Sequence, residues 1–324
     1  MVAVSKPASS AITASSNVSR NGSGDEGSTS NGNDKENFTA RNLLALLGTM
    51  PPMADYETLI VNNDNGILWV SLNRPEVRNA ISAQMQADLR AVWTGARWDD
   101  DVRCIVLTAE GDHFCTGIDR AEAISESNIA AIAAGKNPGF STPWVYDDPG
   151  RDISPKNCDL WKPVISAVQG QACAGAFYML GDTEFIIASE EATFFDPHVT
   201  YGMTAAYEPI HLLSKMPFPE IMRMALLGVH ERMSAQRAHE IGLVSEVVPR
   251  DELRERAEWC ARRIADAPAL AIQGTLRCLW KGRDVSRAQA VEQATYFISI
   301  GTDAAAFEEG QAAFKGKRPE SRTR

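Results

Sequence analysis

The 324-residue chain has no apolar run that approaches the roughly eighteen residues a membrane-spanning helix requires. Its first fifty residues also lack the positively charged start and the apolar core of a secretory signal peptide. These absences argue against a membrane-embedded or exported protein. We therefore expect a cytoplasmic protein with no membrane partner.

Paired cysteine motifs are missing as well. The six cysteines are scattered, include no CxxC pair and stand mostly in apolar surroundings: Cys104, Cys115, Cys158, Cys173, Cys260 and Cys278. Zinc sites and disulfide frameworks depend on closely and regularly spaced cysteines. The sequence thus predicts no metal site and six reduced, buried thiols.

Basic residues are fewer than acidic ones: the chain has 32 Lys and Arg residues and 42 Asp and Glu residues, for a formal net charge of −10. No nucleic-acid partner is expected, since nucleic acids are held largely by cationic surfaces. The P-loop motif GxxxxGK[ST] is also absent. Basic residues do crowd into the last ten positions: Lys315, Lys317, Arg318, Arg322 and Arg324. This tail is either a solvated, frayed terminus or a local patch for an anionic small ligand.

Large apolar side chains are scarce at the start of the chain. Ser, Asn, Gly and Asp dominate residues 1–38, which cannot bury enough surface to offset the entropy of ordering. We expect a disordered leader over residues 1–52. Its acidic residues argue against a mitochondrial transit peptide: Asp25, Glu26, Asp34 and Glu36. Met53 is an alternative candidate for the native start of translation.

Beyond the leader, apolar patterning predicts a mixed α/β core over residues 53–248. Runs at 56–61 and 66–72 flank a polar turn and indicate a hairpin. Ser82 can cap a helix whose apolar residues recur at helical spacing: Met85, Leu89, Val92 and Ala96. Short apolar runs predict three more buried strands: 104–108, 164–168 and 184–188.

Strand signals become sparse after residue 248, so residues 249–319 form a predicted helical region. Asp251 is expected to cap its first helix, whose apolar face carries four residues: Leu253, Ala257, Cys260 and Ile264. Further helices are predicted over 269–281 and 287–300. The basic tail occupies residues 320–324.

Two glycine segments follow buried strands: HFCTGID (His113–Asp119) and QGQACAGAFY (Gln169–Tyr178). In the second, small residues allow backbone N–H groups to approach a ligand, and a helix start adds partial positive charge. Each also has a plain structural explanation, a turn for the first segment and tight helix packing for the second.

Together, the two segments closely resemble the crotonase (enoyl-CoA hydratase/isomerase) superfamily. The resemblance extends to four more segments: LNRPEVRNAIS (72–82), KPVISAVQG (162–170), MSAQRAHEIGLVSEVV (233–248) and FKGKRP (314–319). It covers residues 55–319. It implies a crotonase-like spiral of ββα units and a C-terminal helical region that assembles the chain into a homotrimer or homohexamer.

The resemblance also implies an acyl-CoA substrate, with coenzyme A present only as part of that substrate and no further cofactor. Within the matching motifs, the backbone amides of Ile118 and Gly175 would form an oxyanion hole. Two such donors stabilise the negative charge that develops on a thioester oxygen when an enolate forms.

Coenzyme A would lie near the LNRPEVRNA loop, so the resemblance makes Arg74 and Arg78 neighbours of its phosphates or adenine. Thr116 and Gly117 of the first glycine segment would also contact it. Lys317 stands where family members often direct a lysine toward the CoA phosphates, commonly across a subunit boundary. This adds support to a ligand-binding interpretation of the basic tail, which stays open beside that of a solvated terminus.

The sequence departs from the hydratase pattern at two positions. Typical hydratases hold the attacking water between two glutamates, whereas this chain has Tyr178 at the first position and His198 at the second. Histidine, with an ordinary pKa near 6.5, is better matched to proton transfer than tyrosine, with a pKa of about 10. His198 is therefore the expected base, and Tyr178 would donate a hydrogen bond to substrate or to a water held by His198. Asp196 and Glu208 are the carboxylates that can substitute.

The alternative is structural: His198 as a packed, satisfied histidine and Tyr178 as a core aromatic. The leading functional hypothesis is an enoyl-CoA hydratase-like lyase. Two rivals are other reactions on the same scaffold: isomerisation by one base, and hydrolysis of a thioester or carbon–carbon bond. The third rival is non-catalytic acyl-CoA binding. The missing glutamates favour this third hypothesis, and the intact glycines oppose it. The acyl group stays open, because it depends on a predicted irregular lid over residues 122–159.

Overall fold

The computed structural model describes residues 56–123, 148, 150–315 and 321–323. The chain divides into two compact units, Met1–Leu43 and Leu44–Arg324, and the described residues all belong to the second. The predicted leader, Lys317 and most of the predicted lid lie outside the described residues. No helix in the described ranges is long and apolar enough to cross a membrane.

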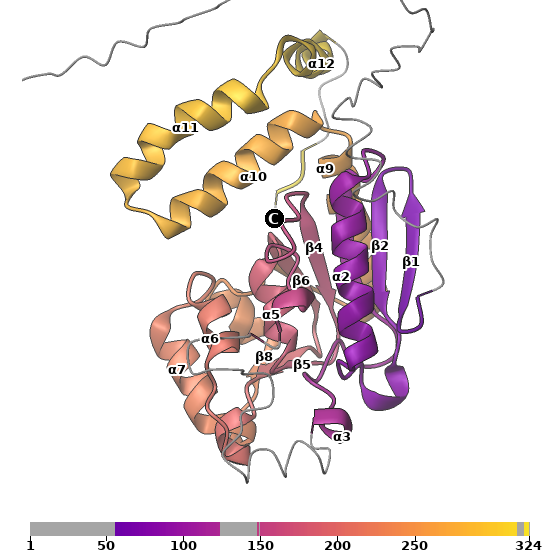
Figure 1. Cartoon of the computed structure of the whole chain (residues 1–324), viewed down its shortest axis with the longest axis vertical. Helices are drawn as coiled ribbons and strands as arrows, with labels where there is room; N and C mark the ends of the chain where they lie inside the picture. The colour runs from indigo at the N-terminus through magenta and orange to yellow at the C-terminus, as the bar shows by residue number, and fades with distance from the viewer. Residues whose placement is uncertain (1–55, 124–147, 149, 316–320, 324) are drawn as a thin grey trace, which may run out of the picture. The chain divides into compact units, whose positions relative to one another are not determined.

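The second unit contains a six-stranded sheet with the strand order β1-β2-β3-β4-β6-β9 (Figure 1). β1 runs antiparallel to β2, and every other neighbouring pair is parallel. The strands are β1 (Leu59–Asp64), β2 (Ile67–Leu72), β3 (Cys104–Ala109), β4 (Val164–Val168), β6 (Phe185–Ser189) and β9 (Glu246–Val248). This sheet, with its covering helices, confirms the predicted mixed α/β class.

Helices cover both faces of this sheet. Ile105 of β3 belongs to the core cluster that contains the apolar face of α2 (Ala83–Trp98), whereas its neighbour Cys104 belongs to the cluster that contains α9 (Leu253–Ala265). Successive strand residues point to opposite faces, so a strand covered on both sides must be apolar throughout. The predicted strands are continuous apolar runs in the sequence because helices cover both faces of the sheet.

The first hairpin and the first long helix form where the sequence predicts them. The hairpin turn is Asn65-Gly66, with φ of 49° and 88° as a type I′ turn requires, so β1 extends past its predicted end at residue 61. The Ser82 hydroxyl caps α2 by accepting a hydrogen bond from the backbone N–H of Met85 at 3.1 Å. The predicted cap is confirmed.

A second, three-stranded sheet has the order β5-β7-β8. Its strands are β5 (Gln171–Cys173), β7 (Thr193–Phe195) and β8 (Met233–Ser234). Twice in succession the chain places one strand in each sheet and then a helix: β4, β5 and α5 (Ala176–Asp182), followed by β6, β7 and α6 (Tyr207–Leu212). These repeats are the ββα units of the expected spiral. The remaining α-helices before α9 are α3 (Arg120–Ala123), α7 (Phe218–Leu227) and α8 (Ala235–Glu240).

The C-terminal region is helical, as predicted. After α9 it contains α10 (Ala269–Asp284), α11 (Arg287–Gly301) and α12 (Ala304–Lys315). The predicted cap at Asp251 is wrong: Asp251 lies inside a 3-10 turn, and Glu252 occupies the N-cap of α9 without a side-chain hydrogen bond. The 3-10 turn begins directly after Pro249, so the chain is already helical before the expected cap.

α10 and α11 pack against each other, as Figure 1 shows, yet most of their apolar side chains stay at least partly exposed. Leu276 is the buried residue of α10, and Gly301 is that of α11. Large apolar side chains more than three-fifths exposed include Leu279, Val291, Tyr296, Ile298 and Ile300. So many exposed large apolar side chains on two neighbouring helices are unusual for a monomer.

All six cysteines lie in the described residues, and all are free thiols. Cys104, Cys115 and Cys173 are buried, whereas the other three are partly exposed. The prediction of reduced cysteines is thus confirmed, and that of complete burial holds for half of them.

Candidate active site

A cavity of about 680 Å³ lies where the two predicted glycine segments meet the loop after β7. Its wall includes residues from both glycine segments and from the predicted base loop: Thr116, Ile118, Ala174, Gly175, His198 and Glu208. The structure therefore brings together segments that are far apart in the sequence.

Gly117 and Gly175 allow the two segments to approach within van der Waals distance. Gly117 has a φ of +87°, in the left-handed region that favours glycine, and a Cβ there would lie 2.7 Å from the Ala174 Cβ. A Cβ on Gly175 would lie 3.4 Å from the Gly117 Cα and 3.4 Å from the Ile118 nitrogen. A side chain at Gly117 would therefore push the segments apart, and one at Gly175 would fill the remaining space between them.

Backbone pairing sets the direction of the Ile118 amide. The Ile81 N–H donates to the Gly117 carbonyl at 2.8 Å, and the Asp119 N–H donates to the Ile81 carbonyl at 2.9 Å. Successive amides of an extended chain point to opposite sides, so the Ile118 N–H points away from Ile81. Within the described residues, no group accepts a hydrogen bond from the Ile118 or the Gly175 amide. Two unpaired donors thus belong to residues of one cavity wall.

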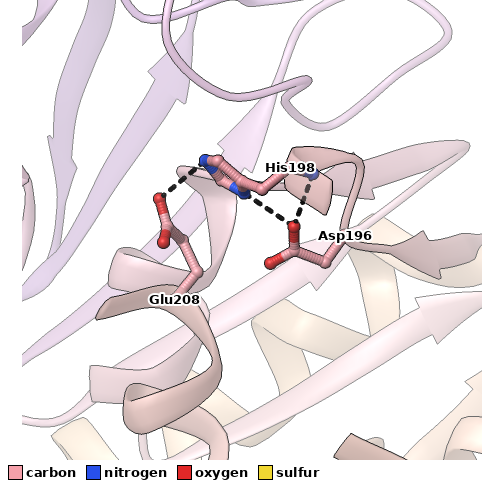
Figure 2. Close-up of side chains that lie close together, drawn as sticks. All are labelled: Asp196, His198 and Glu208. Atoms are coloured by element: carbon pink, nitrogen blue, oxygen red, sulfur yellow. Dashed lines mark hydrogen bonds and ion pairs between the residues drawn. The ribbon is translucent and has the colours of Figure 1, made fainter. Parts of the chain in front are cut away.

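Asp196, His198 and Glu208 form a cluster of titratable side chains, shown in Figure 2. His198 and Glu208 line the cavity. The Asp196 Oδ1 lies 2.6 Å from the His198 Nδ1 and also accepts a hydrogen bond from the His198 backbone N–H at 3.0 Å. On the other side of the ring, the His198 Nε2 lies 3.5 Å from the Glu208 Oε1. The imidazole is thus held between two carboxyl groups, in the 3-10 turn His198–Tyr201 that follows β7.

The surroundings shift the proton affinities of His198 and Glu208 in the same direction. The hydrogen bond that His198 donates to Asp196 raises the pKa of His198. Burial opposes this rise, and the charge of Glu208 adds to it. Burial raises the pKa of Glu208, although the charge of His198 opposes the rise. Both groups therefore retain a proton to higher pH than they would in water, as acid–base groups at neutral pH require.

The same three residues could by spacing hold a metal ion, since each offers a ligand atom within 4.8 Å of the others. Both imidazole nitrogens, however, already face a carboxyl oxygen. The Asp196 Oδ2 is buried and, within the described residues, has no hydrogen-bond partner. Asp196 thus directs one oxygen to His198 and leaves the other without a partner.

Tyr178 is placed differently from the other predicted acid–base residues. Its side chain is 1% exposed and is not part of the cavity wall. Its hydroxyl donates a hydrogen bond to the Asp148 Oδ1 at 2.8 Å, and its ring packs 5.0 Å from that of His211. Burial, helped by the charges of Glu208 and Asp148, raises the pKa of Tyr178. The structure gives this hydroxyl a carboxylate partner in place of the expected water beside His198.

The residues predicted to bind CoA differ in their surroundings. Arg78 and Thr116 line the cavity, and the Thr116 hydroxyl donates to the Arg78 carbonyl at 3.4 Å. Arg74 instead forms an ion pair with Asp119 at 3.0 Å and donates to the Ala80 carbonyl at 2.6 Å. This internal pairing, rather than a ligand phosphate, satisfies Arg74 in the structure.

The sequence analysis did not identify two arginine–aromatic pairs of the cavity wall. Arg120 lies over the ring of Tyr201 at 4.5 Å, and Arg232 lies over the ring of Phe195 at 4.6 Å. All four residues line the cavity. Arg120 directly follows the first glycine segment and comes two residues after Ile118, so its charge could be seen in the sequence. The pairing with aromatics 81 and 37 residues away along the chain could not.

Comparisons with known proteins show the family of the chain. The family model for enoyl-CoA hydratase/isomerase matches residues 62–322. The chain is 30% identical over 255 residues to (E)-benzylidenesuccinyl-CoA hydratase of Thauera aromatica, a match that covers 78% of this chain and 94% of that protein. It is 28% identical to 1,2-epoxyphenylacetyl-CoA isomerase of Escherichia coli, over 81% of this chain and 97% of that protein.

A solved structure is similar over the same range. It is that of an enoyl-CoA hydratase/isomerase from Mycobacterium paratuberculosis, with a TM-score of 0.71 and 36% sequence identity. The match covers 82% of this chain and 97% of that one.

Proposed function

Because this chain belongs to the enoyl-CoA hydratase/isomerase family, we propose that it is an enoyl-CoA hydratase-like enzyme that uses His198 and Glu208 as its acid–base pair. The observation that carries the proposal is that His198 and Glu208 line the cavity whose wall also contains Ile118 and Gly175, with Asp196 bonded to the other side of the His198 ring. A proton-transfer pair thus shares one cavity with two unpaired backbone donors.

The amides of Ile118 and Gly175 form the proposed oxyanion hole. They would receive the thioester carbonyl oxygen of an acyl-CoA and stabilise its charge as the enolate forms. Glycine at 117 and 175 supports this role, because a Cβ on Gly175 would lie 3.4 Å from the Ile118 nitrogen. Enolate stabilisation is common to hydration, isomerisation and hydrolysis in this setting.

The acid–base chemistry follows from the proton positions. Asp196 holds the proton on the His198 Nδ1, which leaves the Nε2 lone pair toward Glu208. In hydration, Nε2 takes a proton from water as the hydroxyl adds to the β carbon. Glu208, whose pKa is raised by burial, gives its proton to the α carbon of the enolate. The proton then returns from Nε2 to Glu208 across the 3.5 Å separation, which resets both groups.

Tyr178, at the position of the first usual glutamate, takes a positioning role in this proposal. Its hydroxyl holds Asp148, which also accepts a hydrogen bond from the backbone N–H of Gly150 at 2.8 Å. A Cβ on Gly150 would collide with the Tyr178 ring, so Gly150 packs closely over that ring. No proton transfer is assigned to the tyrosine.

The CoA moiety is proposed to lie toward Arg78, Thr116 and Gly117, and Lys317 remains a proposed phosphate contact. The acyl-CoA substrate itself is supported by the family, and by relatives named as hydratases and as an isomerase. Isomerisation by a single base is therefore the second candidate reaction. No metal and no further cofactor is invoked.

Incubation with crotonyl-CoA, a 3-enoyl-CoA and a β-keto acyl-CoA tests the proposal, with products identified by mass. Addition of 18 mass units to crotonyl-CoA is expected, about the mass of one water molecule, and His198→Ala and Glu208→Gln are each expected to slow it by about 10²- to 10⁴-fold. Conversion of the 3-enoyl-CoA alone would favour isomerisation. If all three compounds bind without turnover, the chain is a binding protein.

A further inference from the structure

Three arginines line the cavity, which is more cationic than the rest of this acidic chain: Arg78, Arg120 and Arg232. None of the three forms an ion pair with an acidic side chain of the described residues. An unpaired guanidinium in a cavity is available for an anionic ligand.

Two of these arginines stand apart from the proposed acid–base pair. Arg78 belongs to the loop proposed to hold coenzyme A, and its backbone carbonyl accepts a hydrogen bond from the Thr116 hydroxyl at 3.4 Å. Arg78 is therefore matched to the phosphate-bearing part of the substrate. Arg232 lies over the ring of Phe195, at the end of β7, at 4.6 Å.

Arg120 connects the two segments that carry the proposed chemistry. It follows Ile118, the first proposed oxyanion residue, by two positions, and its guanidinium lies 4.5 Å from the centroid of the Tyr201 ring. Tyr201 ends the 3-10 turn that begins with His198. The Arg120–Tyr201 contact thus joins the oxyanion segment to the base segment. The acyl chain would extend along this side of the cavity from a thioester carbonyl held by the two amides.

Building on the proposed function, we propose that the natural acyl group carries a second carboxylate and that Arg120 binds it. Stacking on Tyr201 occupies a face of the guanidinium and leaves the N–H donors at its edge for a bidentate carboxylate. It also limits the conformations of a long, exposed side chain before substrate binds. The substrate class is a 2-enoyl-CoA with an anionic terminus, rather than an unsubstituted fatty acyl-CoA.

The experiment compares two acyl-CoAs that differ only at the terminus: pent-2-enoyl-CoA, which ends in a methyl group, and 4-carboxybut-2-enoyl-CoA, which ends in a carboxylate. The quantity of interest is the ratio of their kcat/KM values, carboxylate over methyl. We expect a ratio above one for the wild type and a decrease of about 10- to 100-fold in Arg120→Leu, as for loss of a charged hydrogen-bond partner. Arg120→Lys should be intermediate, because lysine keeps the charge but lacks the planar fork.

Arg232→Leu is the matched control, since it removes another unpaired cavity arginine. It is expected to weaken both substrates together and to leave their ratio unchanged. A wild-type preference for the methyl terminus, or an equal loss for both substrates in Arg120→Leu, would overturn the proposal and assign Arg120 to coenzyme A.

Binding of the saturated analogues pentanoyl-CoA and 4-carboxybutanoyl-CoA, measured by calorimetry, separates this inference from the proposed function. Tighter binding of the carboxylate analogue that depends on Arg120 supports the inference even if neither enoyl-CoA reacts, in which case the proposed hydratase activity alone fails. Equal binding of both analogues contradicts the inference even if both enoyl-CoAs are hydrated.

Discussion

A single oxygen of Asp196 contacts His198 twice, through the backbone amide at 3.0 Å and through the ring Nδ1 at 2.6 Å. The two residues are separated only by Pro197, whose ring restricts the backbone between them. Asp196 is completely buried, so its carboxylate meets His198 in a medium of low polarity. The contact therefore sets both the tautomer and the proton affinity of the imidazole.

Asp196→Asn is expected to shift the pH dependence of kcat/KM to lower pH. Asp196 raises the pKa of His198, and a base is active only when unprotonated. In the wild type, activity should fall as the pH drops through a value above the ordinary 6.5. The variant should retain its smaller activity, reduced by roughly 100-fold, to lower pH. An acidic limb that does not move would show that His198 is not the titrating base.

Glu208→Gln should stabilise the protein at pH 8 while it impairs catalysis. The folded-state pKa of Glu208 lies above the unfolded value, so the wild type is favoured at low pH and loses that stability as the pH rises through the raised pKa. Glutamine removes the buried charge. Thermal unfolding should give a higher Tm than wild type at pH 8, by a few degrees, and a smaller difference at pH 4. A lower Tm at both pH values would contradict the assigned burial effect.

Tyr178→Phe distinguishes a positioning tyrosine from a catalytic one. Loss of the hydrogen bond to Asp148 should lower the free energy of unfolding by about 1 kcal/mol. Because the hydroxyl does not reach the cavity wall, kcat should stay within about tenfold of wild type, well short of the loss expected for a general acid or base. Parallel measurement of chemical denaturation and initial rates checks both expectations. A rate decrease as large as that of His198→Ala would make Tyr178 catalytic.

Gly175→Ala tests the close approach of the two glycine segments. The new methyl group would lie 3.3 Å from the Ile81 Cδ1 and 3.4 Å from the Ile118 nitrogen, so the Ile81 side chain must shift by a few tenths of an ångström and the Ile118 amide has no room to spare. We expect kcat to fall by about tenfold or more, since small displacements of oriented groups are costly. Ile81→Val removes the Cδ1 atom, and the double variant should recover part of the rate. If Gly175→Ala has wild-type kcat, the Gly175 amide has no part in the oxyanion hole.

The exposed apolar surface of α10 and α11 should mediate self-association. Ile298 is 65% exposed and Ile300 is 73% exposed, consistent with the proposed homotrimer or homohexamer. Light scattering after size exclusion should report a trimer or hexamer for the wild type and a smaller species for Ile298→Glu. Ile60→Glu is the control, because Ile60 is a 49% exposed residue of the edge strand β1. A monomeric wild type would refute the assembly.

Local patterns were sufficient for most of the large sheet. The runs that became β3, β4 and β6 are apolar at nearly every position because helices cover both faces, and Ser82 satisfies the start of α2 through its own side chain. The sheet of β5, β7 and β8 could not be predicted in this way. Its strands have two or three residues, too few for any periodicity to appear.

The sequence by itself determined the family, the two glycines that allow close backbone contact, and the replacement of both usual glutamates by Tyr178 and His198. Only the tertiary structure decided which polar group each of these two residues contacts. Tyr178 donates to Asp148, whereas His198 meets Glu208 across the start of α6. Which buried polar atoms find each other depends on how separate segments pack in space, and no spacing along the chain encodes that distance.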